Sequence, residues 1–222
     1  MKEILVNAVK NGQKTLSEFE SKKILKSAGV PVTKEFLAGS KAEALKMAKE
    51  IGYPVALKGS GHKVAHKTEL GLVKLRIDND NELSKAYDEI MGKGAELDGV
   101  LVQEMINGGR EFIMGLSRDP QFGPCVMFGL GGIFAEVLKD VSFRVAPLKE
   151  ADALEMINEI KTSRLLDEFR GSPGVDKPML AKVLVGLGNL ALDYKEIAEI
   201  DVNPLIIANG KPIAVDSLVV LS

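Results

Sequence analysis

The sequence changes character near residue 100, and this change limits the folds open to the chain. Stripes of apolar residues at helical spacing are expected at 18–28, 40–51, about 80–91, 149–161 and 179–194. Short strand-like runs are expected at 32–37, 53–58, 72–77, 100–103, 111–116, 124–128, 135–138, 197–207 and 213–219. Before residue 100 helices and strands are mixed, whereas four short strand-like runs follow one another directly after it. This order predicts an α+β protein of two lobes, residues 1–99 and 100–222.

Composition excludes several classes of partner. The 29 basic and 31 acidic side chains give a net charge of -2, so nucleic acid and anionic membranes are not expected partners. No apolar run approaches the roughly 20 residues of a membrane span. Cys125 is the only cysteine, which excludes an internal disulfide and a cysteine metal cluster. Together with the lack of a signal-peptide pattern, this favours the cytoplasm.

Lys58 ends an apolar strand-like run and precedes the glycines at 59 and 61. A lysine there provides a point charge for a phosphate, and glycines allow backbone N–H groups to approach it closely. The spacing is not that of a Walker A loop. A solvated lysine at the tip of a strand remains the alternative explanation.

His62 and His66, the only histidines, lie in the glycine-bounded stretch GSGHKVAHKTELG at 59–71. A neutral imidazole nitrogen is nucleophilic near pH 7, so His66 is a candidate carrier of a phosphoryl group. The glycine-rich context argues against a helical metal pair. A solvent-exposed histidine without function is the alternative.

Two carboxylates, Glu104 and Glu111, flank a glycine turn in QEMINGGRE at 103–111. We expect a hairpin-like connection in which one carboxylate meets an adenine amino group or ribose hydroxyls, while the intervening backbone meets the adenine edge. A hairpin that carries two exposed acids would give the same sequence. The pattern therefore indicates a nucleotide site without requiring one.

Asn203, in EIDVNPL at 199–205, and Asp216 lie on two runs expected to pair as strands. Amide and carboxylate oxygens suit Mg²⁺, which needs only one or two protein side chains because phosphates and water complete its octahedron. An Asn-Pro turn and a surface aspartate are the alternative. The glycines of GLGG at 129–132 either cradle phosphate or turn the chain, and Arg144 either contacts phosphate or forms a structural ion pair.

The order of these elements along the chain resembles that of the ATP-grasp fold, in which two α+β lobes clamp ATP. The chain is most similar to the β subunits of ADP-forming acyl-CoA (acetyl-CoA) synthetases, from residue 16 onward. The stretches that carry the resemblance are 60–71, 102–111, 118–124, 128–134, 142–147 and 199–205. Position 72 is Leu where relatives often carry a second glycine.

The resemblance implies a role for each candidate residue. Lys58 would contact a nucleotide phosphate, and His66 would take a phosphoryl group from a histidine of the partner subunit and pass it to ADP. The remaining assignments are Glu104, Met105 and Ile106 to the adenine hinge, Glu111 to the ribose side, and Asn203 and Asp216 to Mg²⁺. Roles for Glu69 and Asp201 stay open.

The implied reaction converts acyl-CoA, ADP and phosphate into an acid, CoA and ATP, with ADP or ATP as substrate and Mg²⁺ as cofactor. It also implies a CoA-binding α subunit in a hetero-oligomer, expected to be α2β2. A self-contained ATP-grasp ligase and a non-catalytic nucleotide sensor are the alternative functions. The acyl group and the choice between ADP and GDP are not specified by the sequence.

Overall fold

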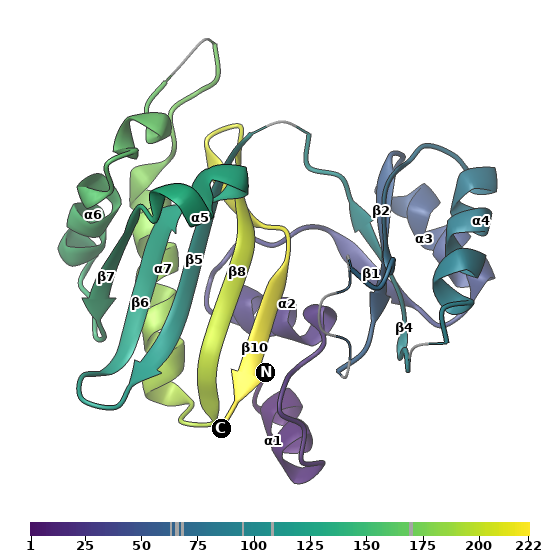
Figure 1. Ribbon diagram of the computed structural model, residues 1–222, viewed down its shortest axis with the longest axis horizontal. Helices are drawn as coiled ribbons and strands as arrows, with labels where there is room; N and C mark the ends of the chain where they lie inside the picture. Colours follow the sequence, from purple (N-terminus) through teal and green to yellow (C-terminus); the bar gives the residue numbers. More distant parts are fainter. Residues whose placement is uncertain (63, 65–66, 68, 95, 108, 169–170) are drawn as a thin grey trace. The chain divides into compact units, whose positions relative to one another are not determined.

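The computed structural model describes residues 1–222 apart from 63, 65–66, 68, 95, 108 and 169–170 (Figure 1). The chain divides into two compact units. The larger unit comprises Met1–Lys14, Ser21–Val32 and Ile106–Ser222, and the smaller unit comprises Thr15–Glu20 and Thr33–Met105. The predicted boundary between residues 99 and 100 therefore differs from the observed division, because the N-terminal segments join the larger unit and residues 100–105 remain in the smaller one.

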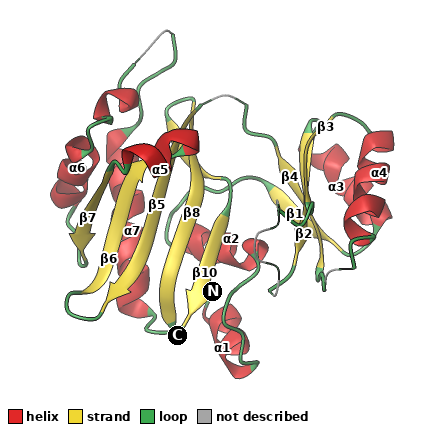
Figure 2. Cartoon of the chain, in the orientation of Figure 1, coloured by secondary structure: helices red, strands yellow, loops and turns green. Residues whose placement is uncertain are grey.

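The smaller unit contains a four-stranded antiparallel sheet with two helices (Figure 2). Its strands are β1 (Glu35–Ala38), β2 (Val55–Ser60), β3 (Val73–Ile77) and β4 (Gly99–Glu104), in the order β1-β4-β2-β3. Helices α3 (Lys41–Ile51) and α4 (Asp80–Met91) pack against this sheet.

Local sequence explains the helices of the smaller unit. Ser40 accepts a hydrogen bond from the backbone N–H of Glu43 at the start of α3, and Asn79 caps α4 in the same way. Apolar side chains of both helices share one core with Val55, Leu57 and other strand residues. Successive side chains of a strand point to opposite faces, so Ala56, Lys58 and Ser60 lie on the other face of β2.

The larger unit is built on a six-stranded antiparallel sheet. Its strands are β5 (Arg110–Asp119), β6 (Gly123–Leu130), β7 (Val141–Val145), β8 (Ile197–Ala208), β9 (Lys211–Ala214) and β10 (Ser217–Leu221). Their order is β10-β8-β5-β6-β7, with β9 paired to β8. The helical elements are α1 (Lys2–Lys10), η1 (Gly132–Phe134), α5 (Ala135–Leu138), α6 (Glu150–Glu159), η2 (Ser163–Leu166), α7 (Lys177–Asp193) and most of α2 (Glu18–Ser27), whose first residues belong to the smaller unit.

Helix α7 supplies much of the core of the larger unit. It packs against β5, β6 and α6, and most of its apolar side chains are buried. A Cβ at Gly186 would lie 2.3 Å from the carbonyl oxygen of Ala28, so only glycine allows this approach. Phe112 of β5 and Phe128 of β6 stack with ring centroids 5.4 Å apart. Together α6 and α7 cover one face of the sheet (Figure 1).

Arg118, in the RDPQFGP stretch, has a structural role. Its guanidinium donates hydrogen bonds to the carbonyl oxygens of Ala191, Tyr194 and Ile197. The last carbonyls of a helix lack partners within the helix, and a cation is favoured there. Arg118 thus joins the end of α7 to the sheet.

Several expectations about the secondary structure were incomplete or wrong. The strand expected at 213–219 is divided into β9 and β10 by Val215 and Asp216. The runs around 100–103 and 111–116 do not form a hairpin, because β4 pairs with β1 and β2 whereas β5 pairs with β6 and β8. Residues Ala135–Leu138 form helix α5 rather than a strand, since the chain turns at Gly132, where φ is 73°, and coils at once. Helix α1 and strand β7 were not predicted, and the expected glycine turn includes residue 108, outside the described residues.

Within the described part of the chain, no helix combines the length and the hydrophobicity that crossing a membrane requires.

Asp140, directly before β7, gives a test of the larger unit's stability. Its buried carboxylate accepts hydrogen bonds from the backbone N–H groups of Lys161 and Thr162, each at 2.8 Å, and from the Thr162 hydroxyl. Burial by itself would raise the pKa of Asp140, but these hydrogen bonds outweigh it and hold the pKa below its usual value.

We expect Asp140→Asn to lower the free energy of unfolding by about 1–3 kcal/mol at neutral pH, since an amide leaves a buried donor without its acceptor. A carboxylate with a lowered pKa stabilises the fold above its unfolded pKa, roughly 4. The difference from the parent protein should therefore shrink as the pH falls below that value. Urea unfolding at several pH values measures this. The exposed Asp78→Asn variant serves as the control, and an equal loss at every pH would contradict the assignment.

Candidate functional site

The larger unit exposes a row of polar side chains on β8. Glu199, Asp201 and Asn203 alternate along the strand with the buried Ile200 and Val202, so they share the opposite face. The register between β5 and β8 shifts beside Asn203, where β8 holds one more residue than its partner. Such a bulge redirects the side chains next to it.

Asn203 and Asp216 are neighbours, as the predicted strand pairing required. Strand β10 runs antiparallel to β8, with Ser217 opposite Val202. The backbone N–H of Asn203 donates to the carbonyl oxygen of Asp216 at 3.3 Å. Asn203 is exposed on β8, and the half-buried Asp216 lies in the short bend between β9 and β10, directly before β10, so an amide and a carboxylate lie close together at one end of the exposed row.

Negative charge gathers around this pair. The Asp201 side chain is exposed by area, yet the surrounding protein desolvates its carboxyl and raises its pKa, and the charges of Glu199 and Asp216 raise the pKa further. No group of three His, Cys, Asp or Glu side chains among the described residues is arranged to hold a metal. The oxygen donors of Asn203 and Asp216 fit a Mg²⁺ ion that takes most of its ligands from phosphates and water.

Glu111 of β5 lies next to the glycines that end β6. The backbone N–H of Gly131 donates to the carbonyl oxygen of Glu111 at 3.0 Å. A Cβ at Gly131 would lie 2.7 Å from the backbone of Phe112, and one at Gly132 would lie 3.2 Å from a carboxylate oxygen of Glu111. Close packing therefore explains a glycine at 131, and the exposed Glu111 carboxylate points toward the turn that follows.

The predicted hinge, Glu104 to Ile106, lies where the chain passes from one unit to the other. Met105 is the last residue of the smaller unit and Ile106 begins the final segment of the larger one. The carboxylate of Glu104 accepts a 2.6 Å hydrogen bond from the backbone N–H of Lys34, whose carbonyl oxygen accepts from the backbone N–H of Glu104 at 2.9 Å. Glu104 thus anchors the segment before β1.

A cavity of ≈ 270 Å³ in the larger unit is lined by Asn107, Arg110, Pro173, Asn209 and their neighbours. The Arg110 guanidinium beside it donates to the carbonyl oxygens of Leu165, Asp167 and Pro173. These bonds fix the segment around η2 against the start of β5. Arg144 forms an ion pair with Glu159 at 2.7 Å, which supports its structural role.

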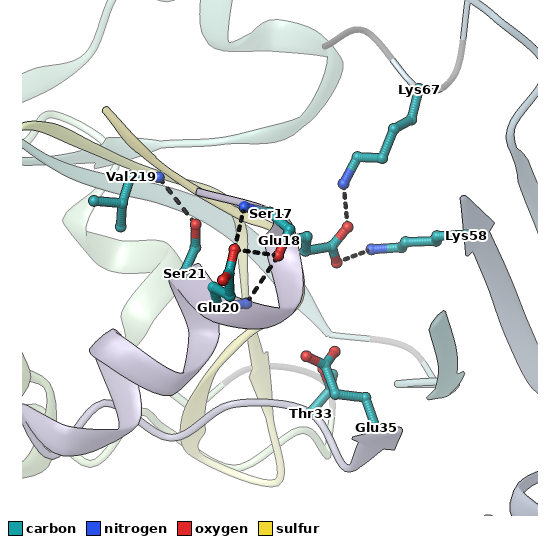
Figure 3. A network of polar contacts seen from close by, with 9 residues as sticks. All are labelled: Ser17, Glu18, Glu20, Ser21, Thr33, Glu35, Lys58, Lys67 and Val219. Atoms are coloured by element: carbon teal, nitrogen blue, oxygen red, sulfur yellow. Dashed lines mark hydrogen bonds and ion pairs between the residues drawn. The ribbon is translucent and has the colours of Figure 1, made fainter. Parts of the chain in front are cut away.

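Lys58 lies within β2 rather than at its tip, since the strand continues to Ser60. Its ammonium is buried and lies 2.7 Å from a carboxylate oxygen of Glu18, whose other oxygen contacts the ammonium of Lys67 (Figure 3). The Glu18 side chain is only 2% exposed. The structure thus brings a buried carboxylate to Lys58, a partner that sequence reasoning missed.

The sequence does contain a local pattern that places Glu18 at the start of a helix. Ser17 and Glu20 form a reciprocal cap, in which the Glu20 carboxylate accepts from the Ser17 backbone and hydroxyl. This cap fixes Glu18 in the first turn of α2. Its partners, however, lie 40 and 49 residues away, so the sequence gives no indication of the pairing.

His66 itself lies outside the described residues. Two described residues near it have contacts: the Thr15 hydroxyl donates to the carbonyl oxygen of His62 at 2.7 Å, and the Lys67 ammonium contacts the Glu18 carboxylate. His62 also lies 3.8 Å from a carboxylate oxygen of Asp98.

Comparison with known proteins gives relatives along the whole chain. The β subunit of ADP-forming acetate–CoA ligase I from Pyrococcus furiosus is 46% identical over 223 residues, which cover 98% of this chain and 96% of that one. ADP-forming acetate–CoA ligase I from Archaeoglobus fulgidus is 40% identical over 99% of this chain, but the match covers only 33% of that longer protein.

A solved structure is similar over 100% of this chain and 99% of its own, with a TM-score of 0.89 and 44% identity. It is the Ca. Korarchaeum cryptofilum dinucleotide forming acetyl-coenzyme A synthetase 1 in complex with coenzyme A and Mg-AMPPCP, its phosphohistidine segment pointing towards the nucleotide binding site. The ATP-grasp domain family matches residues 7–221. With its two α+β units and this match over nearly its whole length, the chain belongs to the ATP-grasp domain family.

Proposed function

We propose that this chain is the nucleotide-binding β subunit of an ADP-forming acetate–CoA ligase. The observation that carries the proposal is its match, almost end to end, with a protein that is itself a β subunit of such a ligase. The reaction would convert acetyl-CoA, ADP and phosphate into acetate, CoA and ATP. Cys125 is free, and a cytoplasmic location suits an enzyme with a single unpaired thiol.

The complete reaction requires a second polypeptide or segment. The chain spans about a third of the single-chain ligases that it matches, at 31% and 33% of their lengths. The part of those ligases that has no counterpart here would supply the CoA and acyl sites. We therefore propose a CoA-binding α subunit as the partner, in a hetero-oligomer of α2β2 type.

The larger unit would hold Mg²⁺ and much of the nucleotide. Asn203 on β8 and Asp216, directly before β10, would supply the oxygen donors, and Glu111 would supply a carboxylate on β5 for ribose hydroxyls. Met105 and Ile106, with Glu104 before them, would offer backbone to the adenine edge. Mg²⁺ bound there would neutralise charge on the phosphates, whereas the protein groups orient the nucleotide.

The smaller unit would carry the phosphoryl group. His66 would accept it from a histidine of the partner: the P–N bond to that histidine breaks as the P–N bond to His66 forms. In the next step ADP attacks the phosphorus, ATP leaves, and His66 is free again. The buried ammonium of Lys58 would hold a phosphate of the nucleotide and stabilise the charge that develops during transfer.

Two other functions fit the site less well. A nucleotide sensor does not need a histidine in a glycine-bounded stretch. Nor does it need the contacts that Thr15 and Glu18 make with His62 and Lys67. A self-contained ligase would need acyl and thiol sites besides the nucleotide site, whereas this chain matches about a third of the length of the single-chain ligases. It would hydrolyse ATP in the presence of a carboxylate without a partner, which an ATPase assay of the single chain tests directly.

His66 is tested by the complex with its partner. Acetyl-CoA with phosphate should produce an acid-labile phosphoprotein on this chain, and His66→Asn should abolish both the label and ATP synthesis, because an amide cannot carry the phosphoryl group. Radiolabelled phosphate with an alkaline quench measures the intermediate, and loss of the label on acid treatment shows that it is acid-labile. His62→Asn, which changes the other histidine, should keep the label, and normal turnover by His66→Asn would refute the relay.

The magnesium ligands make a separate prediction. We expect Asp216→Asn to raise the Mg²⁺ concentration for half-maximal ATP synthesis by about tenfold or more, because a carboxylate ligand becomes neutral. Asn203→Ala should act in the same direction. Asp119→Asn, in the turn after β5, is the matched control, since its side chain only accepts backbone hydrogen bonds from residues 121 and 122. Mg²⁺ titrations that coincide for all these variants would exclude the site.

A further inference from the structure

We infer that Glu18 is a positioning residue for phosphoryl transfer, which holds Lys58 in place and anchors the segment that follows His66 through Lys67. This inference rests on the proposed function. It concerns the geometry of the step between the phosphohistidine and the nucleotide, and it assigns a role to a carboxylate at the start of α2.

The contacts place one carboxylate between two ammonium groups. One oxygen of Glu18 lies 2.7 Å from Nζ of Lys58, and the other contacts Nζ of Lys67 (Figure 3). The side chains of Glu18, Lys58 and Lys67 are 2%, 6% and 17% exposed. Each oxygen therefore serves a different lysine, and the three groups form a largely buried unit.

The charges of this unit suit a site for phosphate. Positive charge gathers around this carboxylate, since the ammonium groups of Lys58 and Lys67 both contact it, and a phosphoryl group carries negative charge. A lysine ammonium sits on a flexible four-carbon stem, so a fixed carboxylate partner reduces the positions that it samples. Glu18 would thereby arrange positive charge before the nucleotide arrives, and prearranged charge is what stabilises a transition state.

Ser60 provides an independent indication of a ligand. It lies two residues after Lys58 on β2, so both side chains are on the same face of the strand. Ser60 is 3% exposed, and its hydroxyl has no hydrogen-bond partner within the described part of the structure. Buried hydroxyls without a partner are rare and call for an explanation. A phosphate oxygen next to Lys58 would supply the missing partner.

The segment that contains Thr15 and Glu18 holds both flanks of the stretch around His66. Thr15 binds the backbone of His62, four residues before His66, and Glu18 binds Lys67, the residue directly after it. The Glu18 carboxylate that contacts Lys67 also contacts Lys58. A change at Glu18 should therefore disturb the phosphate lysine and the segment after His66 together.

Loss of the Glu18 carboxylate should affect the two halves of the reaction unequally. Because Glu18 ties Lys67 to the lysine proposed to bind the nucleotide, its loss should slow the discharge of the phosphohistidine to ADP more than its formation. The phosphorylated form should then accumulate during turnover. A misplacement of about 1 Å in such a site can cost on the order of 100-fold in rate.

The experiment uses the complex of this chain with its partner subunit. Glu18→Gln keeps the size of the side chain and removes its charge. We expect the rate constant for ADP phosphorylation in a single turnover to fall about 10- to 100-fold. The acid-labile phosphoprotein at steady state should rise, and Glu18→Asp should restore part of the rate. Rapid quench in alkali with labelled phosphate measures both quantities.

Glu20→Gln is the matched control. Glu20 lies in the same turn of α2, and its carboxylate caps the helix through Ser17 without contacting a lysine in any described interaction. If Glu18 only stabilised the helix, both variants would phosphorylate ADP at the parent rate once the folded fraction is taken into account. This result would overturn the inference. If Glu18→Gln does not fold, Lys67→Gln tests the same contact from the more exposed side.

The outcomes separate the inference from the proposed function. If the parent complex forms no acid-labile phosphoprotein, the relay itself is wrong. If the parent complex forms it and discharges it to ADP, but Glu18→Gln discharges it at the parent rate, the relay stands and the role of Glu18 is refuted. A double variant, Glu18→Gln with Lys67→Gln, should be no slower than Glu18→Gln alone, because Glu18→Gln already removes the ion pair that Lys67→Gln would remove.

Discussion

Strand β8 organises the larger unit because it pairs along its length with other strands on both sides. It has 12 residues and forms antiparallel ladders with β5, β9 and β10. Its buried side chains hold it in the core, and alternation then forces Glu199, Asp201 and Asn203 onto the opposite face. The row of polar side chains thus follows from the burial of the other face of β8. Asp216 lies beside this row because β10, which it directly precedes, pairs with β8.

The smaller unit depends on a different constraint, the cost of burying charge. Lys58 lies on a strand whose alternate side chains enter the core, and its ammonium is removed from water. An isolated buried ammonium is very costly, so a carboxylate must accompany it. Glu18 meets this need from the first turn of α2, and its second oxygen serves Lys67. The Glu18 carboxylate therefore makes the burial of Lys58 possible and also belongs to the proposed site for phosphate.

Much of the fold followed from local patterns. Helix α4 has the predicted bounds, and Ser40 and Gly52 bound α3 as capping residues and glycines usually do. The apparent hairpin between 100–103 and 111–116 failed because glycines between two strands show only that the chain turns. They do not show which strand each one will pair with. Strand β4 joins β1 and β2, so Glu104 and Glu111 lie on different sheets.

Motif order and strand alternation were enough to predict the family, the α+β class and the candidates Lys58, His66, Glu111, Asn203 and Asp216. The sequence also placed Asn203 beside Asp216, since pairing of consecutive strands is the simplest arrangement. Only the tertiary structure revealed the grouping of Glu18 with Lys58 and Lys67, and the division of the chain into discontinuous units. Both depend on contacts between residues far apart in the chain, which packing and electrostatics select and which leave no local pattern.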